Sequence, residues 1–427
     1  MLSHFMRRTL LLAGMATCLS PITSMAQGSA LTLRDAIVRV MEVNPKLTGQ
    51  KFSLAAADAR RDQAALRPVI EAGLEVEDIF GTDRLSRFKD AQVTLQLSTV
   101  LEFGGKRANR VGAAEREREL VLTTFDAEKL DIVAEVTRRF IHLVAAQREA
   151  ALAQQSLDLA ANTRKAVAQR VSAGRGAAVE DRNADVAFTL AEIEVSRAKS
   201  DVSQAVQSLA AMWSGGEIDA VDAVAELFNL PMLAPATELA AMLAQNPNLL
   251  RFASERRVEE AKLRLAESQA SADITVGAGV RRLVRERSNA IVLSLSVPLG
   301  ASGRSAPYTA EARSNLQQVD YREQAARAEL TATLKSFHQE AMQRTAELAA
   351  LREKAVPQAE SARELTQSGF NAGRFSLLEL LNAQRQWIEL QHEAIEAAVA
   401  YHNAVIEIER LTARAASVAD ETMNKSR

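Results

Sequence analysis

The chain contains the same unit twice, and this duplication limits its possible folds more than any other feature. The segment VSAGRGAAVEDRNAD at 171–185 recurs as FNAGRFSLLELLNAQ at 370–384, 199 residues later. Asn44-Pro45 likewise recurs as Asn246-Pro247, 202 residues later. Because the offset barely changes, we infer that a domain-sized unit was duplicated with few insertions. We predict a first repeat at 27–213, an inter-repeat segment at 214–235, a second repeat at 236–412 and a C-terminal tail at 413–427.

The first 26 residues have the pattern of a secretory signal peptide. Arg7 and Arg8 precede an apolar run, and Ser24-Met25-Ala26 resembles a small-residue cleavage site. We therefore assign 1–26 to a signal peptide and place the mature chain outside the cytoplasm. Cys18 is the only cysteine, and it would be a lipidation site if the leader were of the lipoprotein type. Thr17 fits that pattern poorly, so we interpret Cys18 as part of the discarded leader.

Each repeat contains two segments in which apolar and polar residues alternate. This alternation predicts strands at about 69–80, 90–103, 273–284 and 289–300. Such strands have one apolar and one polar face. A strand of ~11 residues, tilted by ~45°, spans the ~25 Å apolar band of an outer-membrane barrel. A sheet of a water-soluble protein that packs its apolar face on helices has the same pattern, so that interpretation stays open.

Four strands are too few to close a membrane barrel, since the smallest have about eight. Unpaired backbone N–H and C=O groups at open edges cannot face lipid, because nothing there can bond to them. If these strands span a membrane, several protomers must therefore share one barrel. The polar face would then line a pore, and the candidate pore-lining residues are Glu71, Glu75, Glu77 and Glu102.

The remainder of each repeat is predicted to be helical over long distances. No proline occurs between Pro68 and Pro231, and no glycine between Gly112 and Gly174. About 70 residues of helix would extend over ~100 Å. Apolar residues recur at helical spacing and need neighbouring helices to cover them, so we predict coiled-coil packing into a long bundle. Pro357 should kink or interrupt the third long helix.

The two A-G-R turns join the long helices of each repeat at the end farthest from the strands. Gly174 and Gly373 can supply the positive φ that a tight reversal favours. Glu180 and Glu379 fall in the first turns of the helices that follow, where acidic side chains suit the helix dipole. We place the tips at 172–178 and 370–376.

Composition and motifs argue against several classes of function. The formal net charge is −2, and no basic patch indicates a nucleic-acid partner. The sequence has no phosphate-binding loop, no H-E-x-x-H and no pair of cysteines. The histidines of the mature chain are scattered along helical segments. We therefore expect no enzymatic activity, no cofactor and no metal site.

Four motifs resemble the outer-membrane factor (TolC-like) efflux family. They are LRDAIVRVMEVNP at 33–45, LEFGGKR at 101–107, AGRFSLLELLNAQ at 372–384 and YHNAVIEIERLT at 401–412. The LEFGGKR form is similar to the heavy-metal (cobalt-zinc-cadmium) exporter branch. The resemblance implies a mixed α/β membrane protein, mostly α, that forms a homotrimer. Four strands per chain would build a 12-strand outer-membrane β-barrel, continued by a periplasmic α-helical barrel and an equatorial region from the inter-repeat segment.

The resemblance also implies partners and site residues. A periplasmic membrane-fusion adaptor would contact the tips and link the channel to an inner-membrane resistance-nodulation-division pump. The implied adaptor-contacting residues are Ala173, Gly174, Arg175, Ala372, Gly373, Arg374, Phe375 and Ser376. The periplasmic gate would fall on Glu180, Glu379 and Asn382. Asn382 stands where the family gate has a second acidic residue, and Phe375 where it has a basic one.

Two other interpretations remain open from the sequence. A multidrug or type I secretion channel would have the same features, because the pump usually selects the substrate. A soluble periplasmic coiled-coil scaffold or adaptor with a small sheet is an alternative of another class. We expect the chain in the outer membrane of a Gram-negative bacterium, with lipid around the sheet and the helices extending into the periplasm.

Overall fold

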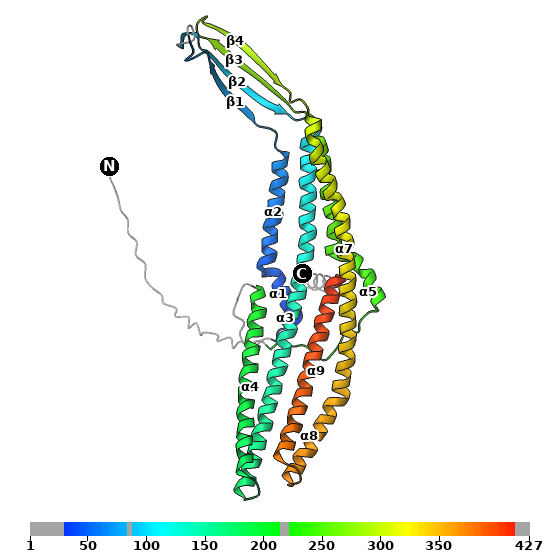
Figure 1. Cartoon of the computed structure of the whole chain (residues 1–427). Helices are drawn as coiled ribbons and strands as arrows, with labels where there is room; N and C mark the ends of the chain where they lie inside the picture. Colours follow the sequence, from blue (N-terminus) through cyan, green and yellow to red (C-terminus); the bar gives the residue numbers. More distant parts are fainter. Residues whose placement is uncertain (1–29, 83–87, 214–221, 415–427) are drawn as a thin grey trace, which may run out of the picture.

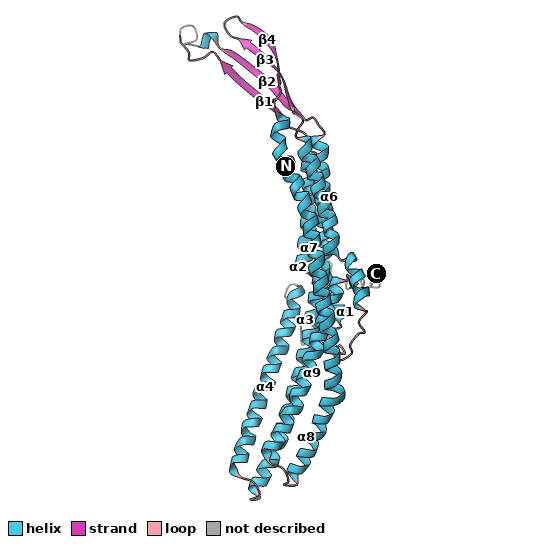
Figure 2. Ribbon diagram, turned by 45° about the vertical axis from the view of Figure 1, so that its right-hand side comes forward, coloured by secondary structure: helices cyan, strands magenta, loops and turns pink. Residues whose placement is uncertain are grey.

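The computed structural model describes residues 30–82, 88–213 and 222–414. The predicted signal peptide, Cys18 and most of the predicted C-terminal tail lie outside these residues. Figures 1 and 2 show a long, slender chain with a small sheet at one end and two helical hairpins at the other.

The helices and strands follow the same order in the two halves. The first half contains α1 (Leu33–Val43), α2 (Pro45–Ala65), β1 (Ile70–Glu77), β2 (Gln92–Leu101), α3 (Lys106–Ser172) and α4 (Ala178–Ala210). The second half contains α5 (Ala236–Met242), α6 (Pro247–Ser268), β3 (Ile274–Leu283), β4 (Ser288–Ser296), α7 (Ala301–Ala350), α8 (Val356–Asn371) and α9 (Leu377–Leu411). At ~1.5 Å per residue, the 67 residues of α3 extend over ~100 Å.

A π-helical turn at Leu351–Ala355 separates α7 from α8. It ends two residues before Pro357, whose missing N–H and bulky ring disturb the preceding helical turn. A π turn shifts the local hydrogen bonding by one residue and so accommodates the disturbance. The predicted interruption of this helix is confirmed.

Both Asn-Pro pairs begin a helix and fasten it to another part of the chain. Asn44 and Asn246 are N-caps whose side-chain oxygens accept the backbone N–H two residues later, at 2.9 and 2.7 Å. The Nδ2 of Asn44 donates to the Met212 carbonyl (2.7 Å), just after α4. The Nδ2 of Asn246 donates to the Leu411 carbonyl (2.8 Å), at the end of α9. In each half, an early helix is thus tied to the end of the last helix.

The apolar core runs along the helices. Its largest cluster joins α1, α3, α4, α9 and the inter-repeat segment around the fully buried Phe140 and Leu143. A second cluster joins α5, α6, α7 and α9 around Tyr401, whose hydroxyl donates to the Pro231 carbonyl. These contacts hold the inter-repeat segment against α9. No helix among the described residues carries an apolar stretch long enough to cross a bilayer.

The four strands form one antiparallel sheet in the order β1-β2-β3-β4. Directly opposite residues share a face, and one such row is Leu74, Leu95, Val280 and Ile291. The register therefore brings the apolar residues of both halves onto one face and most polar residues onto the other. β1 and β4 each have one edge with no strand partner among the described residues.

The strands are shorter than the alternation predicted. β1 ends at Glu77 rather than near 80, because Asp78 and Phe80 adopt φ values of 58° that a strand cannot contain. β4 begins one residue before 289 and ends four residues before 300, since Pro298 cannot donate to a continuing ladder. β2 and β3 are shorter than 90–103 and 273–284 by one or two residues at each end.

Candidate functional site

The apolar face of the sheet is uncovered. Figures 1 and 2 show the sheet projecting beyond the helices, with none of them lying on it. Leu74, Ile291 and Leu293 are 68%, 82% and 79% exposed, which is unusual for large apolar side chains that share one face. The water-soluble interpretation required the apolar face to pack on helices of the same chain. The described helices do not cover this face.

The opposite face of the sheet carries charges. Glu71, Glu75 and Glu77 alternate along β1 on this face, as predicted. Arg281 of β3 forms an ion pair with Glu77 (3.1 Å) and donates from Nε to the Thr94 hydroxyl (2.9 Å). Three of the four predicted pore-lining glutamates are therefore neighbours on one polar surface.

The fourth glutamate, Glu102, lies past the end of β2 and has a different contact. Its carboxylate forms an ion pair with Arg110 of α3 (2.7 Å). The same guanidinium donates to the carbonyls of Ala64 (3.0 Å) and Leu66 (3.2 Å), at the end of α2. Glu102 lies just past the end of β2 and thus helps to fix the junction between sheet and helices.

The two hairpin tips have the same backbone geometry. Gly174 and Gly373 have φ values of 71° and 75°. The N–H groups of Gly174 and Arg175 donate to carbonyls three and five residues earlier, at 3.0 and 2.9 Å. Gly373 and Arg374 form the equivalent pair at 2.9 and 2.8 Å. This is the Schellman pattern, in which a left-handed residue after the helix satisfies its last carbonyls.

The tips differ in the side chains that follow the turn. Ser376 caps α9, and the Glu379 carboxylate accepts both the Ser376 N–H (2.7 Å) and its hydroxyl (2.8 Å) in a capping box. These two bonds hold the pKa of Glu379 below its usual range. The first tip has Ala177 at the cap position with no side-chain cap, so Glu180 has no equivalent bond to it.

Phe375 occupies a space that a glycine provides. A Cβ built on Gly369 would collide with the Phe375 ring, so only glycine allows this packing. Phe375 remains 42% exposed. The predicted contact residues Arg175, Arg374 and Ser376 are also exposed, as is Asn382 on the surface of α9.

Comparison with known proteins decides the family. Residues 36–215 and 239–414 match the sequence model of a family described as "Outer membrane efflux protein". The chain belongs to the outer membrane efflux protein family. The resemblance inferred from the four sequence motifs is confirmed, and this efflux protein resides in the outer membrane with its helices extending into the periplasm.

Individual relatives support the same assignment. The cobalt-zinc-cadmium resistance protein CzcC of Cupriavidus metallidurans is 30% identical over 403 residues, which cover 93% of this chain and 94% of the relative. The solved structure of CusC has a TM-score of 0.74 at 13% identity, covering 89% of this chain and 91% of that one. VceC of Vibrio cholerae has a TM-score of 0.70 at 16% identity, covering 89% and 95%. The fold of this efflux protein is therefore that of outer-membrane channels.

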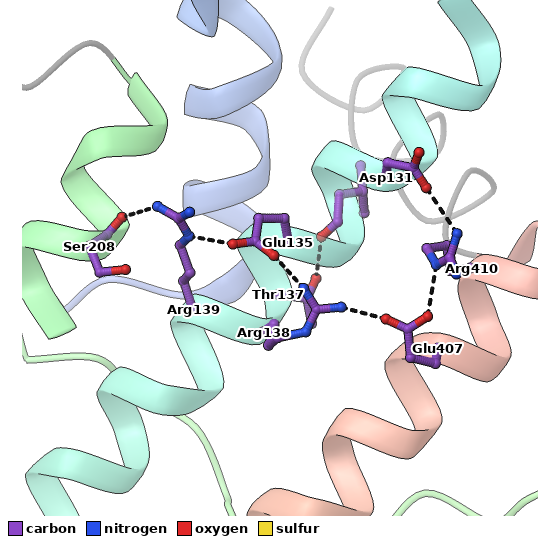
Figure 3. Close-up of polar contacts among 9 residues, drawn as sticks. Asp131, Glu135, Thr137, Arg138, Arg139, Ser208, Glu407 and Arg410 are labelled. Carbon is purple, nitrogen blue, oxygen red and sulfur yellow. Dashed lines mark hydrogen bonds and ion pairs between the residues drawn. The ribbon is translucent and has the colours of Figure 1, made fainter. Parts of the chain in front are cut away.

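A charged network joins α3 to α4 midway along the efflux protein (Figure 3). Arg139 of α3 donates to the Ser208 carbonyl of α4 (2.6 Å) and to Glu135 (2.7 Å). Burial alone would raise the pKa of Glu135, but bonds from Arg139 and Arg138 lower it. The carboxylate is therefore held in its ionised form.

The same network continues from α3 to α9. Arg138 also bonds to Glu407 of α9, and Arg410 donates to Glu407 (2.8 Å) and to Asp131 of α3 (3.1 Å) (Figure 3). Ion pairs thus join α9 to α3, and the hydrogen bond from Arg139 to the Ser208 carbonyl joins α4 to α3. Local sequence patterns do not reveal these contacts, because the partners lie up to 279 positions apart in the sequence.

Near the tips, Arg170 joins the two hairpins of the efflux protein. Its Nη1 donates to the Phe370 carbonyl (2.9 Å), and its guanidinium lies 4.4 Å from the centre of the Phe370 ring. Phe370 is fully buried with Val167 and Leu380. Arg170 was missed by the sequence reasoning, although its position directly before the repeated tip segment was a possible signal.

Higher in the bundle, a histidine bridges the hairpins. His392 of α9 contacts Glu149 of α3 through Nδ1 (2.8 Å) and Glu396 through Nε2 (3.3 Å). The two carboxylates bind opposite sides of the ring, so the three groups do not converge on one point. Among the described residues, no group of three or more His, Cys, Asp or Glu side chains could hold a metal ion.

Proposed function

We propose that this chain is the outer-membrane channel of a tripartite efflux system. Substrate leaves an inner-membrane resistance-nodulation-division pump, follows a periplasmic membrane-fusion adaptor and crosses the channel passively, without chemical change. The two-faced sheet carries this proposal. Its exposed apolar face suits lipid, and its opposite face, with Glu71, Glu75 and Arg281, suits a water-filled lumen.

The open edges of the sheet support a homotrimer. β1 and β4 run antiparallel in this sheet, so β4 of one protomer can pair with β1 of the next and continue the same ladder. Three sheets of four strands give 3 × 4 = 12 strands, an even number within the range of bacterial outer-membrane barrels. Closure removes both edges, which would otherwise leave unpaired backbone groups in lipid.

The inter-repeat segment would form an equatorial region around the helical barrel. Leu31 forms a parallel bridge with Ala223, and Tyr401 and His402 of α9 bond to the carbonyls of Pro231 and Leu227. Leu31 lies at the start of the first repeat and Ala223 lies just after its end. The contacts therefore support an assembly in which the two ends of this repeat meet midway along the helices.

The hairpin tips would bind the adaptor. Both tips present the same backbone turn, so one adaptor motif could recognise each of them. Arg175 and Arg374 would supply charge, and Phe375 an apolar contact. The remaining proposed contact residues are Ala173, Gly174, Ala372, Gly373 and Ser376.

The inner side of the tips would form the periplasmic gate. Three copies of Glu379 around a three-fold axis would create a cation-attracting constriction. Glu180 is the equivalent residue of the first tip, and Asn382 stands where the family gate has a second acidic residue. Mutual repulsion in such a ring would raise the pKa of each Glu379 carboxylate. The capping bonds from Ser376 act in the opposite direction, because they favour the ionised form.

We propose heavy-metal cations as the substrate. The support is the 30% identity to CzcC, a cobalt-zinc-cadmium resistance protein, together with the acidic polar face of the sheet. Deleting the gene should raise sensitivity to zinc, cobalt or cadmium, and an intact copy should restore resistance. Sensitivity to drugs alone would favour a multidrug channel, and loss of a secreted protein would favour type I secretion.

The remaining alternative is a soluble periplasmic scaffold. A channel should fractionate with outer membranes and require detergent for extraction as a trimer. A chain that is recovered from the periplasm as a monomer in plain buffer would instead support the scaffold.

A further inference from the structure

One charged side chain interrupts the apolar face of the sheet. The register places Val76, Val93, Arg282 and Asn289 in the row that follows the all-apolar row of Leu74, Leu95, Val280 and Ile291. Arg282 is exposed, and it is the single charged residue on this face within the four strands. It is the last but one residue of β3, beside the turn to β4, and this turn lies at the end of the sheet remote from the helices (Figure 1).

The position of Arg282 matches a membrane boundary. An arginine on the lipid face costs ~2–4 kcal/mol at the bilayer midplane but only ~0–1 kcal/mol near the interface. The helices leave from the opposite end of the sheet and extend into the periplasm, so Arg282 belongs to the outer boundary. The lipid headgroups at this level are those of the outer leaflet.

The contacts of Arg282 leave its charge uncompensated. Its Nη1 donates to the Arg287 carbonyl (3.0 Å) and to the Asn289 side-chain oxygen (3.1 Å), both neutral acceptors. No carboxylate of the described residues pairs with Arg282, Arg287 or Lys89, whereas Arg285 pairs with Asp90 (2.9 Å). Glu286 is the acidic residue of this turn, and it forms no ion pair with the residues that the structure describes. The turn therefore holds one guanidinium in place while leaving Nε and Nη2 available as donors.

Two exposed aromatic rings lie between β1 and β2, at the same end of the sheet as the turn between β3 and β4 (Figure 1). Phe80 and Phe88 are 75% and 60% exposed and meet edge to face, with ring centroids 5.1 Å apart. Aromatic side chains are typical of the interfaces that flank a barrel's apolar band. A guanidinium presents paired donors that match the oxygens of a phosphate, which makes arginine well suited to this group.

We propose that Arg282 is a binding site for the phosphate of an outer-leaflet lipid headgroup, such as that of lipid A. Arg287 adds positive charge in the same turn, and Lys89 does so in the segment that the Arg285–Asp90 pair joins to this turn. This inference rests on the proposed contact between the apolar face and lipid. The inference adds a specific headgroup phosphate at Arg282, whereas the proposed function requires only that the apolar face contacts lipid chains.

The test compares two lipids on the purified full-length protein in detergent. Diphosphorylated lipid A should bind at least tenfold more tightly than its dephosphorylated form and raise the thermal midpoint, measured by native mass spectrometry and thermal denaturation. Arg282→Gln should weaken binding of the diphosphorylated form about tenfold, since a charge-assisted bond is lost. Arg281→Gln is the matched control, because Arg281 directly precedes Arg282 but lies on the opposite, polar face of the sheet and pairs with Glu77.

Several outcomes would overturn the inference. These are equal binding of the two lipids by the wild-type protein, equal weakening by both substitutions, and stabilisation by inorganic phosphate as strong as that by lipid A. The first comparison needs no variant, so it decides the matter even if Arg282→Gln disturbs the turn. A protein that is trimeric in detergent but indifferent to the phosphate would refute this site alone, whereas a soluble monomer would refute the proposed function.

Discussion

Two buried asparagines connect local capping to the overall assembly of the helices. Asn246 is fully buried, and its amide joins the start of α6 to the end of α9. The sequence showed that the Asn-Pro pair is repeated, and Pro is favoured at the first helical position. The bond to Leu411, 165 residues away, could not be predicted, because it depends on where the last helix returns.

We expect Asn246→Ala to lower the stability of the efflux protein. The change leaves the Leu411 carbonyl and the Asn248 N–H without their partners in a buried site, which costs about 1–3 kcal/mol. Thermal denaturation and faster hydrogen exchange at the end of α9 would report it. Asn183→Ala on the exposed surface of α4 is the control and should change little. Equal effects of the two substitutions would contradict the bridging role.

The contact between Glu149 and His392 should make the joint between α3 and α9 sensitive to pH. Burial alone would lower the pKa of His392, but the carboxylates of Glu149, Glu396 and Glu194 raise it above its ordinary value. Burial also raises the pKa of Glu149. A raised pKa in the folded state gives stability that is present below the unfolded value and lost as pH rises through the folded value.

His392→Gln should therefore destabilise the protein more at about pH 6 than at about pH 9. Thermal midpoints of wild type and variant across this range provide the measurement. His142→Gln serves as the control, since His142 is exposed on α3 and has no ion pair among the described residues. A difference that is constant with pH, or that grows towards alkaline pH, would refute the role of this bridge.

Glu379 links helix capping to the proposed gate. Glu379→Gln removes one charge per protomer, so a ring of three carboxylates would lose its attraction for cations. We expect the cation-over-anion permeability ratio in planar bilayers to fall, whereas Glu180→Gln should have a smaller effect because Glu180 is not fixed by a capping box. Unchanged selectivity in Glu379→Gln would exclude a gating ring at this position.

At the scale of elements, hydrophobic periodicity predicted faces better than ends. Alternation in the sequence placed the strands and separated their apolar from their polar residues, and the register keeps that separation. The end of β1 depends on the positive φ of Asp78 and Phe80, which neither residue type demands. The end of β2 was likewise not predicted: the strand stops one residue before Glu102, which pairs with Arg110 of α3.

The repeated tip turn allows a test with a matched control. Gly373 has φ of 75° and open space around its absent Cβ, so Gly373→Ala should cost about 1–2 kcal/mol through backbone strain alone. Gly49 also has open space but lies within helix α2, so Gly49→Ala should stabilise its helix by about 0.5–1 kcal/mol. Hydrogen exchange measured by mass spectrometry on the peptides around each site should show opposite changes. Changes of the same sign would contradict the tip geometry.

At the scale of the whole molecule, the uncovered sheet supports the proposed assembly of several copies of the chain. Its helices bury several apolar clusters, but the sheet exposes one apolar face, and its two outer strands each have an edge with no strand partner in the part of the chain that the structure describes. The sequence predicted this imbalance from strand number and length, which are local properties. It could not predict how the paired hairpins contact each other through Arg170, Arg138 and His392, since these contacts depend on the packing of distant segments.

The central claim is that β1 of one protomer pairs with β4 of the next, and cysteine cross-linking in isolated outer membranes tests it most directly. Leu74→Cys would be combined in turn with cysteine at Asn289, Ile291, Leu293 or Leu295, all on the same face of the sheet. The mature chain is expected to hold no other cysteine, so each bond is assignable. We predict that at least one pair gives a covalent trimer under oxidising, denaturing conditions, whereas Leu74→Cys alone does not. Monomers for every pair, together with a folded single chain after extraction, would contradict the account.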